Sequence, residues 1–191
     1  RTGSGFEGRE LSRHSPRDGI ATEQHTPIVH EGFLYAIMPK DAGGLAVQFR
    51  DLESGTETSL KCSIVACDSI RDIALLSVDA VPPALAPIEL ADSDMVRTGD
   101  PIVVIGNPGI GVKVLSHTAT EGIVSGKNRK FGDRDFFQIS AAVNPGNSGG
   151  PMLLRSGRAA GMVTLKARLE NVGFAVPAND LLDFIEGLES Q

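Results

Sequence analysis

The feature that most constrains the fold is a series of short runs of apolar and β-branched residues, each bounded by glycine, proline, asparagine or aspartate. These runs fall at residues 32–38, 45–49, 60–67, 73–78, 101–105, 112–115, 122–124, 136–141, 151–154, 159–165 and 172–176. Glycine and proline supply 22 and 11 of the 191 residues, a share typical of chains with many turns. The pattern therefore predicts an all-β sandwich or barrel rather than alternating strands and helices.

The C-terminal segment is the part of the chain that predicts a helix. Leu181, Ile185 and Leu188 recur at helical spacing after residue 177, and Asn179 or Asp180 can cap the helix. We expect this helix to pack one apolar stripe against the strands that precede it.

A proline-rich segment marks the expected boundary between two strand-rich units. Residues 81–87 contain three prolines, which cannot continue the interior of a sheet. The predicted organisation is an N-terminal unit at 1–88, a second unit at 89–176 and the helix at 177–191.

Composition and charge argue against two classes of partner. The chain has 18 basic and 24 acidic side chains, a net charge of −6, and no cluster of basic residues. Nucleic acid is not an expected partner, because phosphate neutralisation needs lysine and arginine gathered on one face. Membrane insertion is not expected either, because no apolar run approaches the roughly 20 residues of a spanning helix. The charged segment 127–134 is typical of a solvated surface loop.

The two cysteines fall in one predicted strand. Cys62 and Cys67 are five residues apart, so their side chains point to opposite faces of that strand and cannot form a disulfide within it. We expect two free thiols.

The most informative motif is the segment 146–151, with the sequence GNSGGP. Its glycines permit positive φ and leave backbone N–H groups uncovered around Ser148, as an oxyanion site requires. The same residue types dominate ordinary turns. As an ordered hexapeptide, however, the motif arises by chance on the order of once in 100,000 chains at ~5–7% usage per residue.

The segment 138–151, QISAAVNPGNSGGP, resembles the nucleophile region of the HtrA/Deg branch of the trypsin-like serine proteases. Further stretches resemble this branch in the same order: 3–6 (GSGF), 67–76 (CDSIRDIALL), 96–100 (VRTGD), 105–108 (IGNP), 121–125 (EGIVS) and 172–177 (VGFAVP). The resemblance implies two six-stranded antiparallel β-barrels followed by a C-terminal helix. The sequence contains no segment that resembles the PDZ module many relatives carry downstream, so it is expected to be either a piece of a longer protein or a stand-alone protease.

The resemblance also implies a catalytic triad, with Ser148 as nucleophile. Asp72, just before an apolar strand, is the expected orienting carboxylate, and His25 is the expected general base. His25 follows the aliphatic-x-Thr-x-x-His pattern of the family, in the form IATEQH, and His30 is the alternative base. Asp68 also has a counterpart in the family, but we expect it to have a structural role.

Two further groups of residues follow from the resemblance. The backbone N–H groups of Gly146 and Ser148 are expected to receive the oxyanion, and Asn147 lies between them. The expected substrate pocket has Ala142 at its floor, residues Thr164, Leu165 and Lys166 along one wall, and Gly173 at the back. Without a carboxylate at the floor, a small or aliphatic residue is expected at the cleavage position rather than lysine or arginine.

The function expected from these residues is hydrolysis of peptide bonds in protein or peptide substrates through an acyl-enzyme, with no metal or organic cofactor. A catalytically inactive or latent module of the same fold, acting by binding peptides or proteins, is the alternative. The resemblance also suggests a homotrimer and an extracytoplasmic location, although the sequence itself determines neither.

Overall fold

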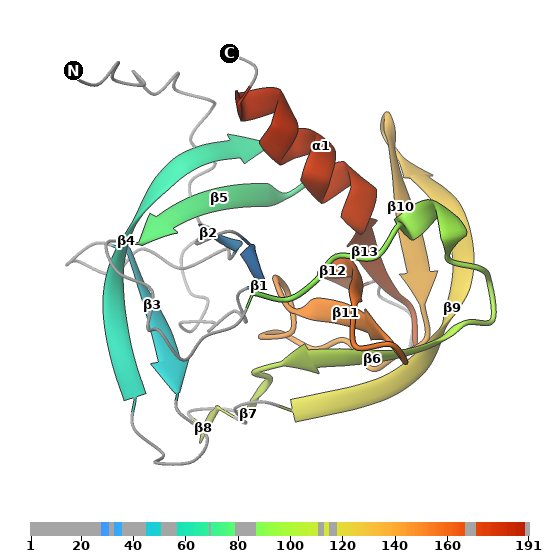
Figure 1. Ribbon diagram of the computed structural model, residues 1–191. Coiled ribbons are helices and arrows are strands. Elements are labelled where there is room, and N and C mark those ends of the chain that lie inside the picture. Colours follow the sequence, from blue (N-terminus) through green and yellow to red (C-terminus); the bar gives the residue numbers. More distant parts are fainter. Residues whose placement is uncertain are drawn as a thin grey trace.

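The computed structural model describes residues 28–30, 33–35, 45–50, 57–68, 70–78, 87–110, 113–114, 118–166 and 171–189. Figure 1 shows two groups of strands, with one helix lying across both. The first group contains β1 (Ile28–His30), β2 (Phe33–Tyr35), β3 (Leu45–Arg50), β4 (Glu57–Asp68) and β5 (Ile73–Val78). The second group contains β6 (Pro101–Gly106), β9 (Thr118–Phe131), β10 (Arg134–Ile139), β11 (Pro151–Leu154), β12 (Ala159–Lys166) and β13 (Gly173–Pro177). The remaining elements are the strand pair β7 (Gly109–Ile110) and β8 (Lys113–Val114), the short 3-10 helix η1 (Ser93–Met95) and the helix α1 (Ala178–Glu189).

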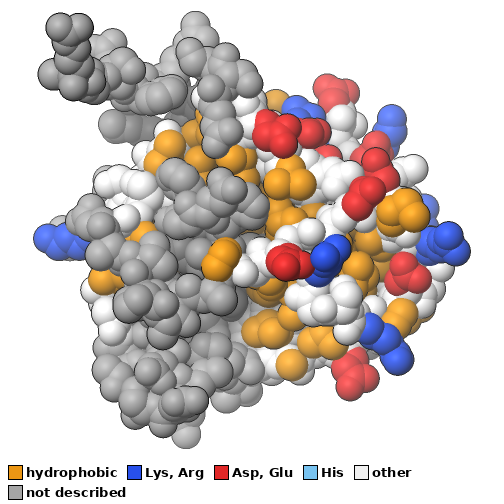
Figure 2. All heavy atoms as spheres, in the orientation of Figure 1, with side chains coloured by type: hydrophobic (Ala, Val, Ile, Leu, Met, Phe, Trp, Pro, Cys, Tyr) orange, Lys and Arg blue, Asp and Glu red, His pale blue; other side chains and the backbone are white. Residues whose placement is uncertain are grey.

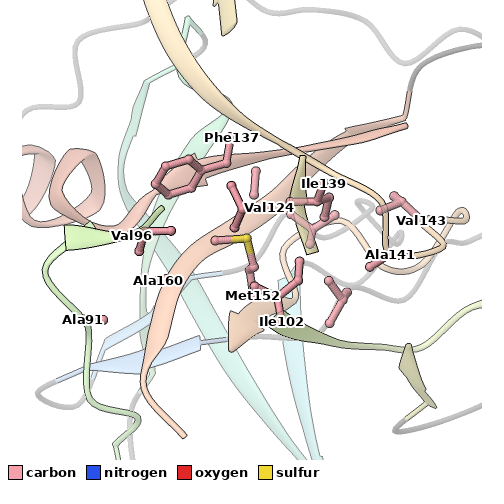
Figure 3. Packing of buried hydrophobic residues seen from close by; sticks show 13 residues of the cluster. Ala91, Val96, Ile102, Val124, Phe137, Ile139, Ala141, Val143, Met152 and Ala160 are labelled. Carbon is pink, nitrogen blue, oxygen red and sulfur yellow. The ribbon is translucent and has the colours of Figure 1, made fainter. Parts of the chain in front are cut away.

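The second group of strands closes into a six-stranded antiparallel barrel. Its strand order is β10-β13-β12-β11-β6-β9, and the last strand pairs with the first. Alternate residues of β6, such as Ile102 and Val104, point into the barrel, as the period of two in a strand requires. The interior is filled by a cluster of buried side chains, with Met152 of β11 in its midst (Figure 3). The prediction of a six-stranded barrel in this half of the chain is confirmed.

The first group of strands forms a five-stranded sheet in the order β1-β2-β5-β4-β3. The long strand β4 pairs with β3 on one side and with β5 on the other. A closed six-stranded barrel, which we expected for 1–88, is not seen in the part of this half that the structure describes. The proline-rich boundary segment lies mostly outside the described residues.

A second apolar cluster joins the two groups of strands. Ile73 and Leu75 of β5 pack with Met162 of β12, Phe174 of β13 and Leu181 of α1. All five side chains are buried. The first residues of β5 are therefore held against the second barrel, and this contact places Asp72, which immediately precedes β5, at the border between the two halves.

Helix α1 confirms the predicted C-terminal helix but not its predicted cap. The stripe of Leu181, Ile185 and Leu188 packs on the second cluster as expected. The helix begins at Ala178, one residue before Asn179, so Asn179 lies inside the first turn.

The Asn179 side chain instead reaches η1, at the start of the second barrel. Asn179 Oδ1 accepts from the Ser93 N–H at 3.0 Å, and Ser93 Oγ accepts from the Asn179 N–H at 3.1 Å. The helix N–H is thus satisfied by a hydroxyl from a residue 86 positions earlier. This reciprocal pair ties the beginning of the second barrel to the element that follows its last strand.

The segment 127–134 is not a loop, and this prediction was wrong. Strand β9 continues to Phe131 and β10 begins at Arg134, so Gly132 and Asp133 form the turn of a hairpin. Gly132 has φ +62°, as tight hairpin turns require. Lys127 is half-buried and donates to the carbonyl oxygens of Asp94 and Val96 at 3.0 and 2.6 Å. The many charged residues of this segment indicated a loop, but they are the polar side chains of two paired strands.

The prediction of two free thiols is confirmed. Cys62 and Cys67 both lie in β4 and are free, as expected, and burial raises the pKa of each thiol.

Acidic and basic side chains alternate over the described part of the face in Figure 2, with hydrophobic side chains between them. Among the described residues, the structure has no helix both long and apolar enough to span a membrane.

Candidate active site

The turn that carries Ser148 lies between β10 and β11 and is built from two successive backbone turns. The Asn147 N–H donates to the Asn144 carbonyl at 2.9 Å, and the Gly150 N–H donates to the Asn147 carbonyl at 3.0 Å. Gly146 and Gly149 have φ +96° and +81°, a region that other residues rarely adopt. The motif therefore folds into the compact turn that its glycines predicted.

Close packing against the chain after β6 also explains why Gly146 is a glycine. A Cβ at this position would collide with the carbonyl oxygen of Asn107. The Asn107 N–H also donates to the Gly146 carbonyl at 3.0 Å. The turn is thus fastened to the segment 106–108, which the sequence pattern IGNP had marked only by resemblance.

Asn147 is the buried support of this turn. It is 1% exposed, and its Nδ2 donates to the Ala142 carbonyl at 3.1 Å. Its backbone N–H is already committed to Asn144, so this N–H is not directed at an oxyanion. The carboxamide instead joins the turn that carries Ser148 to the residue predicted as the floor of the substrate pocket.

Asp72 lies at the end of the turn that leads into β5, as predicted. Its backbone has φ +59°, and the next residue, Ile73, is buried and paired with Asp68 of β4. The Asp72 carboxylate reaches the second barrel, where its Oδ2 accepts a hydrogen bond from Thr164 Oγ1. The buried start of β5 thus holds the carboxylate at the border between the two halves.

Thr164 connects Asp72 with the candidate nucleophile. Its carbonyl oxygen accepts from Ser148 Oγ at 3.0 Å, while its hydroxyl donates to Asp72. The Thr164 side chain is buried, with 6% exposed. We predicted Thr164 as part of a pocket wall, and the structure gives it a contact with the predicted orienting carboxylate. No sequence pattern indicated this contact, because it joins residues 92 positions apart.

The general base is not located by the structure. His25 lies outside the described residues, as do His14 and His117. His30 is the last residue of β1, where it pairs with Phe33, but the position of its side chain is not among the described features. The choice between His25 and His30 therefore stays a prediction.

The predicted pocket residues lie on neighbouring elements of the second barrel. Gly173 pairs with Lys166 of β12 and with Ile139 of β10. A Cβ at Gly173 would lie 2.5 Å from Cγ2 of Val143, the neighbour of Ala142. The structure therefore brings Gly173 close to the segment that carries Ala142, while the side chains of Leu165 and Lys166 lie outside the described residues.

Two polar contacts near the predicted pocket residue Ala142 were not predicted from the sequence. Ala142 is exposed, and its carbonyl oxygen accepts from Thr120 Oγ1 at 3.2 Å in addition to Asn147 Nδ2. Ser140 Oγ accepts from the Ile123 N–H at 3.0 Å. Both contacts fasten the segment after β10 to β9, and they join residues 22 and 17 positions apart, so no local sequence pattern indicated them.

The closed barrel, the glycine turn around Ser148 and the link to Asp72 define a class of protein. The chain belongs to the family of trypsin-like peptidase domains, whose family model matches residues 17–162.

Individual relatives narrow this similarity to one branch of the family. The chain is 38% identical over 153 residues to the serine protease Do-like HtrA of Bacillus subtilis (strain 168), covering 73% of this chain and 32% of that protein. It is 36% identical over 142 residues to the serine protease HtrA-like of Staphylococcus aureus (strain USA300), covering 67% of this chain and 18% of that protein. The chain thus spans less than two thirds of the length of these curated relatives.

A solved structure agrees with the sequence relatives. The structure of the HtrA-type protease AlgW with a decapeptide superposes with a TM-score of 0.66 and 31% sequence identity. The match covers 86% of this chain and 50% of that chain. The predicted family resemblance is confirmed.

Proposed function

We propose that this chain is the protease domain of an HtrA-like serine endopeptidase, which hydrolyses peptide bonds in protein substrates through an acyl-enzyme. The observation that carries the proposal is the link from Ser148 through Thr164 to Asp72. It joins the nucleophile turn of one half of the molecule to the candidate orienting carboxylate of the other. The names of the relatives, and the decapeptide that accompanies AlgW in the similar structure, support the same reaction and substrate class.

In the proposed mechanism, Ser148 Oγ attacks the scissile carbonyl carbon while His25 accepts the hydroxyl proton. Asp72 holds the imidazole in the productive tautomer and stabilises the imidazolium. The N–H groups of Gly146 and Ser148 receive the negative charge that develops on the carbonyl oxygen. His25 then protonates the leaving amine, and a water molecule repeats the cycle on the acyl-enzyme. No step requires a metal ion or an organic cofactor.

The proposal includes a two-barrel architecture. The N-terminal barrel spans 1–88 and supplies His25 and Asp72, whereas the C-terminal barrel spans 89–176 and supplies Ser148. The apolar cluster between β5, β12, β13 and α1 supports this arrangement, because it fixes the strand that follows Asp72 against the barrel that carries Ser148. The substrate would bind along the border between the two halves.

The proposed preference at the cleavage position is a small or aliphatic residue. Ala142, the proposed floor, offers no counter-ion for lysine or arginine. Val143 fills the space beside Gly173, where even a Cβ would collide with it, and this packing supports a short apolar pocket. Leu165 and Lys166 complete the proposed wall and rim.

Proteolysis of unfolded casein tests the proposed function. The native chain should degrade casein, and Ser148→Ala should lose on the order of 10⁶ in turnover, because the members of such a triad act as a unit. A peptide library should be cut mainly after small or aliphatic residues. If the native chain bound casein but did not cleave it, the inactive or latent peptide-binding module would replace the proposal. Cleavage predominantly after arginine would refute the proposed pocket.

A further inference from the structure

We infer that Asp68 is a positioning residue for Asp72: its carboxylate holds the turn between β4 and β5 in the shape that directs Asp72 toward Thr164. The inference rests on the proposed function, because Asp72 is the orienting carboxylate of that site. Asp68 is the last residue of β4, and neither the proposed mechanism nor the substrate pocket assigns it a part.

Both oxygens of the Asp68 carboxylate have partners within the turn. Oδ1 accepts from the N–H groups of Ile70 and Arg71 at 2.9 and 3.0 Å. Oδ2 lies 3.4 Å from Nη1 of Arg71, and the side chains of Asp68 and Arg71 are only 18% and 17% exposed. A carboxylate that accepts backbone N–H groups two and three residues ahead fixes the path of a turn. Here it fixes the residues immediately before Asp72.

The backbone of Asp72 needs such support. Its φ of +59° lies in the left-handed region, which is uncommon for residues other than glycine, although aspartate adopts it more readily than most when local hydrogen bonds support it. On the C-terminal side, the buried Ile73 is paired with Asp68 itself and sets the register of β5. On the N-terminal side, the described contacts that shape the turn are those of the Asp68 carboxylate. Asp68 therefore contacts both ends of the short connection that presents Asp72, through its carboxylate at Ile70 and Arg71 and through its backbone at Ile73.

The direction of the Asp72 carboxylate depends on this backbone conformation. From the left-handed position, its Oδ2 accepts the hydrogen bond from Thr164 Oγ1 across the border between the two halves. If the turn relaxed to an ordinary φ, the Cα–Cβ bond of Asp72 would point in another direction. A displacement of about 1 Å in a catalytic group costs about 100-fold in rate. Loss of the Asp68 contacts should therefore reduce catalysis without removing any group that touches the substrate.

Three substitutions separate the geometry of the Asp68 contacts from their charge. The readout is the second-order rate constant for inactivation by a fluorophosphonate probe, measured on the full chain. Asp68→Ala removes every contact of the carboxylate but leaves the strand pairing with Ile73, and it should slow inactivation by about 10- to 100-fold. Asp68→Asn keeps an oxygen that accepts both N–H groups and should stay within about fivefold of the native rate. Asp68→Glu keeps the charge but moves it one methylene away, so it should behave like the alanine variant.

A double-mutant comparison shows whether Asp68 acts through Asp72. In the Asp72→Ala background, Asp68→Ala should change the rate by less than about twofold, because the group that it positions is gone. Asp100→Ala is the matched control: Asp100 Oδ2 accepts from the Arg97 N–H at 2.7 Å in a turn that carries no proposed site residue. This control should keep the native rate.

The outcomes distinguish this inference from the proposed function. If the native chain reacts but Asp68→Ala reacts at the native rate, or if Asp68 and Asp72 substitutions multiply independently, the positioning role is overturned. Equal rates for Asp68→Asn and Asp68→Ala would also overturn it. If the alanine variant fails to fold, Asp68→Asn is compared with Asp68→Glu instead, and equal rates for these two variants would overturn the positioning role. If the native chain and Ser148→Ala are equally unreactive, the proposed function fails and the inference fails with it.

Discussion

At the scale of single residues, the candidate site depends on backbone conformations that few side chains permit. Gly146 has φ +96° and lies against the Asn107 carbonyl, whereas Gly99 has the same φ of +96° but open space where a Cβ would lie, with no atom within 4 Å. These two glycines make the same conformational demand in different surroundings. They therefore allow the effect of the collision to be separated from the effect of the backbone conformation.

Gly146→Ala should reduce fluorophosphonate reactivity by about 100-fold or more, because relief of the collision with Asn107 moves a proposed oxyanion donor. Gly99→Ala should keep the native reactivity and lose only about 1–2 kcal/mol of unfolding free energy to the unfavourable φ. Inactivation kinetics and urea unfolding of both variants check this prediction. Equal reactivity of the two variants would contradict the assigned role of the turn.

Single residues also show where sequence reasoning reaches its limit. The local setting of Ser148 in a glycine turn and of Asp72 just before β5 could be predicted because each lies in a contiguous motif. Thr164 was predicted only as a pocket residue, since its hydrogen bond to Asp72 joins two halves of the chain and leaves no local pattern. Asn147 was placed in the motif, but its burial and its contact with Ala142 depend on how the turn packs on the barrel.

At the scale of elements, helix α1 places a carboxyl group in a partly buried position. Desolvation by burial raises the pKa of Asp180, and the nearby Asp183 and Asp135 add to this effect, while Arg71 and Arg134 oppose it. The folded state therefore binds the proton of Asp180 more tightly than the unfolded state does. This contribution to stability is present below the unfolded pKa and is lost as the pH rises through the folded pKa.

Asp180→Asn should consequently be more stable than the native chain at pH 7, and the difference should shrink as the pH falls toward 3.8, the ordinary value for this group. Urea unfolding at pH 7, 5.5 and 4 measures the difference. Asp183→Asn, an exposed position of the same helix, removes one of the charges that raise this pKa but leaves the Asp180 carboxyl in place, so it should stabilise the chain by less than Asp180→Asn. A variant less stable than the native chain at pH 7 would refute the prediction.

Individual elements differ in how far the sequence predicts them. The bounds of β5 and β11 match the predicted runs 73–78 and 151–154, because both are apolar segments with clear turn residues at their ends. The β9–β10 hairpin was missed because its charged residues hide the strand pattern. Its apolar anchor, Phe131, packs edge-on against Phe136 and Phe174, and this contact exists only after the strands have paired.

At the scale of the whole molecule, the candidate site lies where two groups of strands meet. The cluster that joins β5 to β12, β13 and α1 fixes their contact, and Asp72 reaches Thr164 across the same border. Strand-rich halves and a C-terminal helix were predictable from turn residues and apolar runs. How the halves pack was not, because it depends on side chains far apart in the sequence, such as Ile73 and Phe174.

The most direct test of an activated Ser148 is intact mass after incubation with a fluorophosphonate probe. The test compares the native chain with Ser148→Ala, His25→Ala and His30→Ala. We expect a single adduct on the native chain and on His30→Ala, and none on the other two variants. Labelling that survived His25→Ala but not His30→Ala would make His30 the base. An adduct that persisted on Ser148→Ala, or no adduct on the native chain, would contradict the assignment of Ser148 as an activated nucleophile.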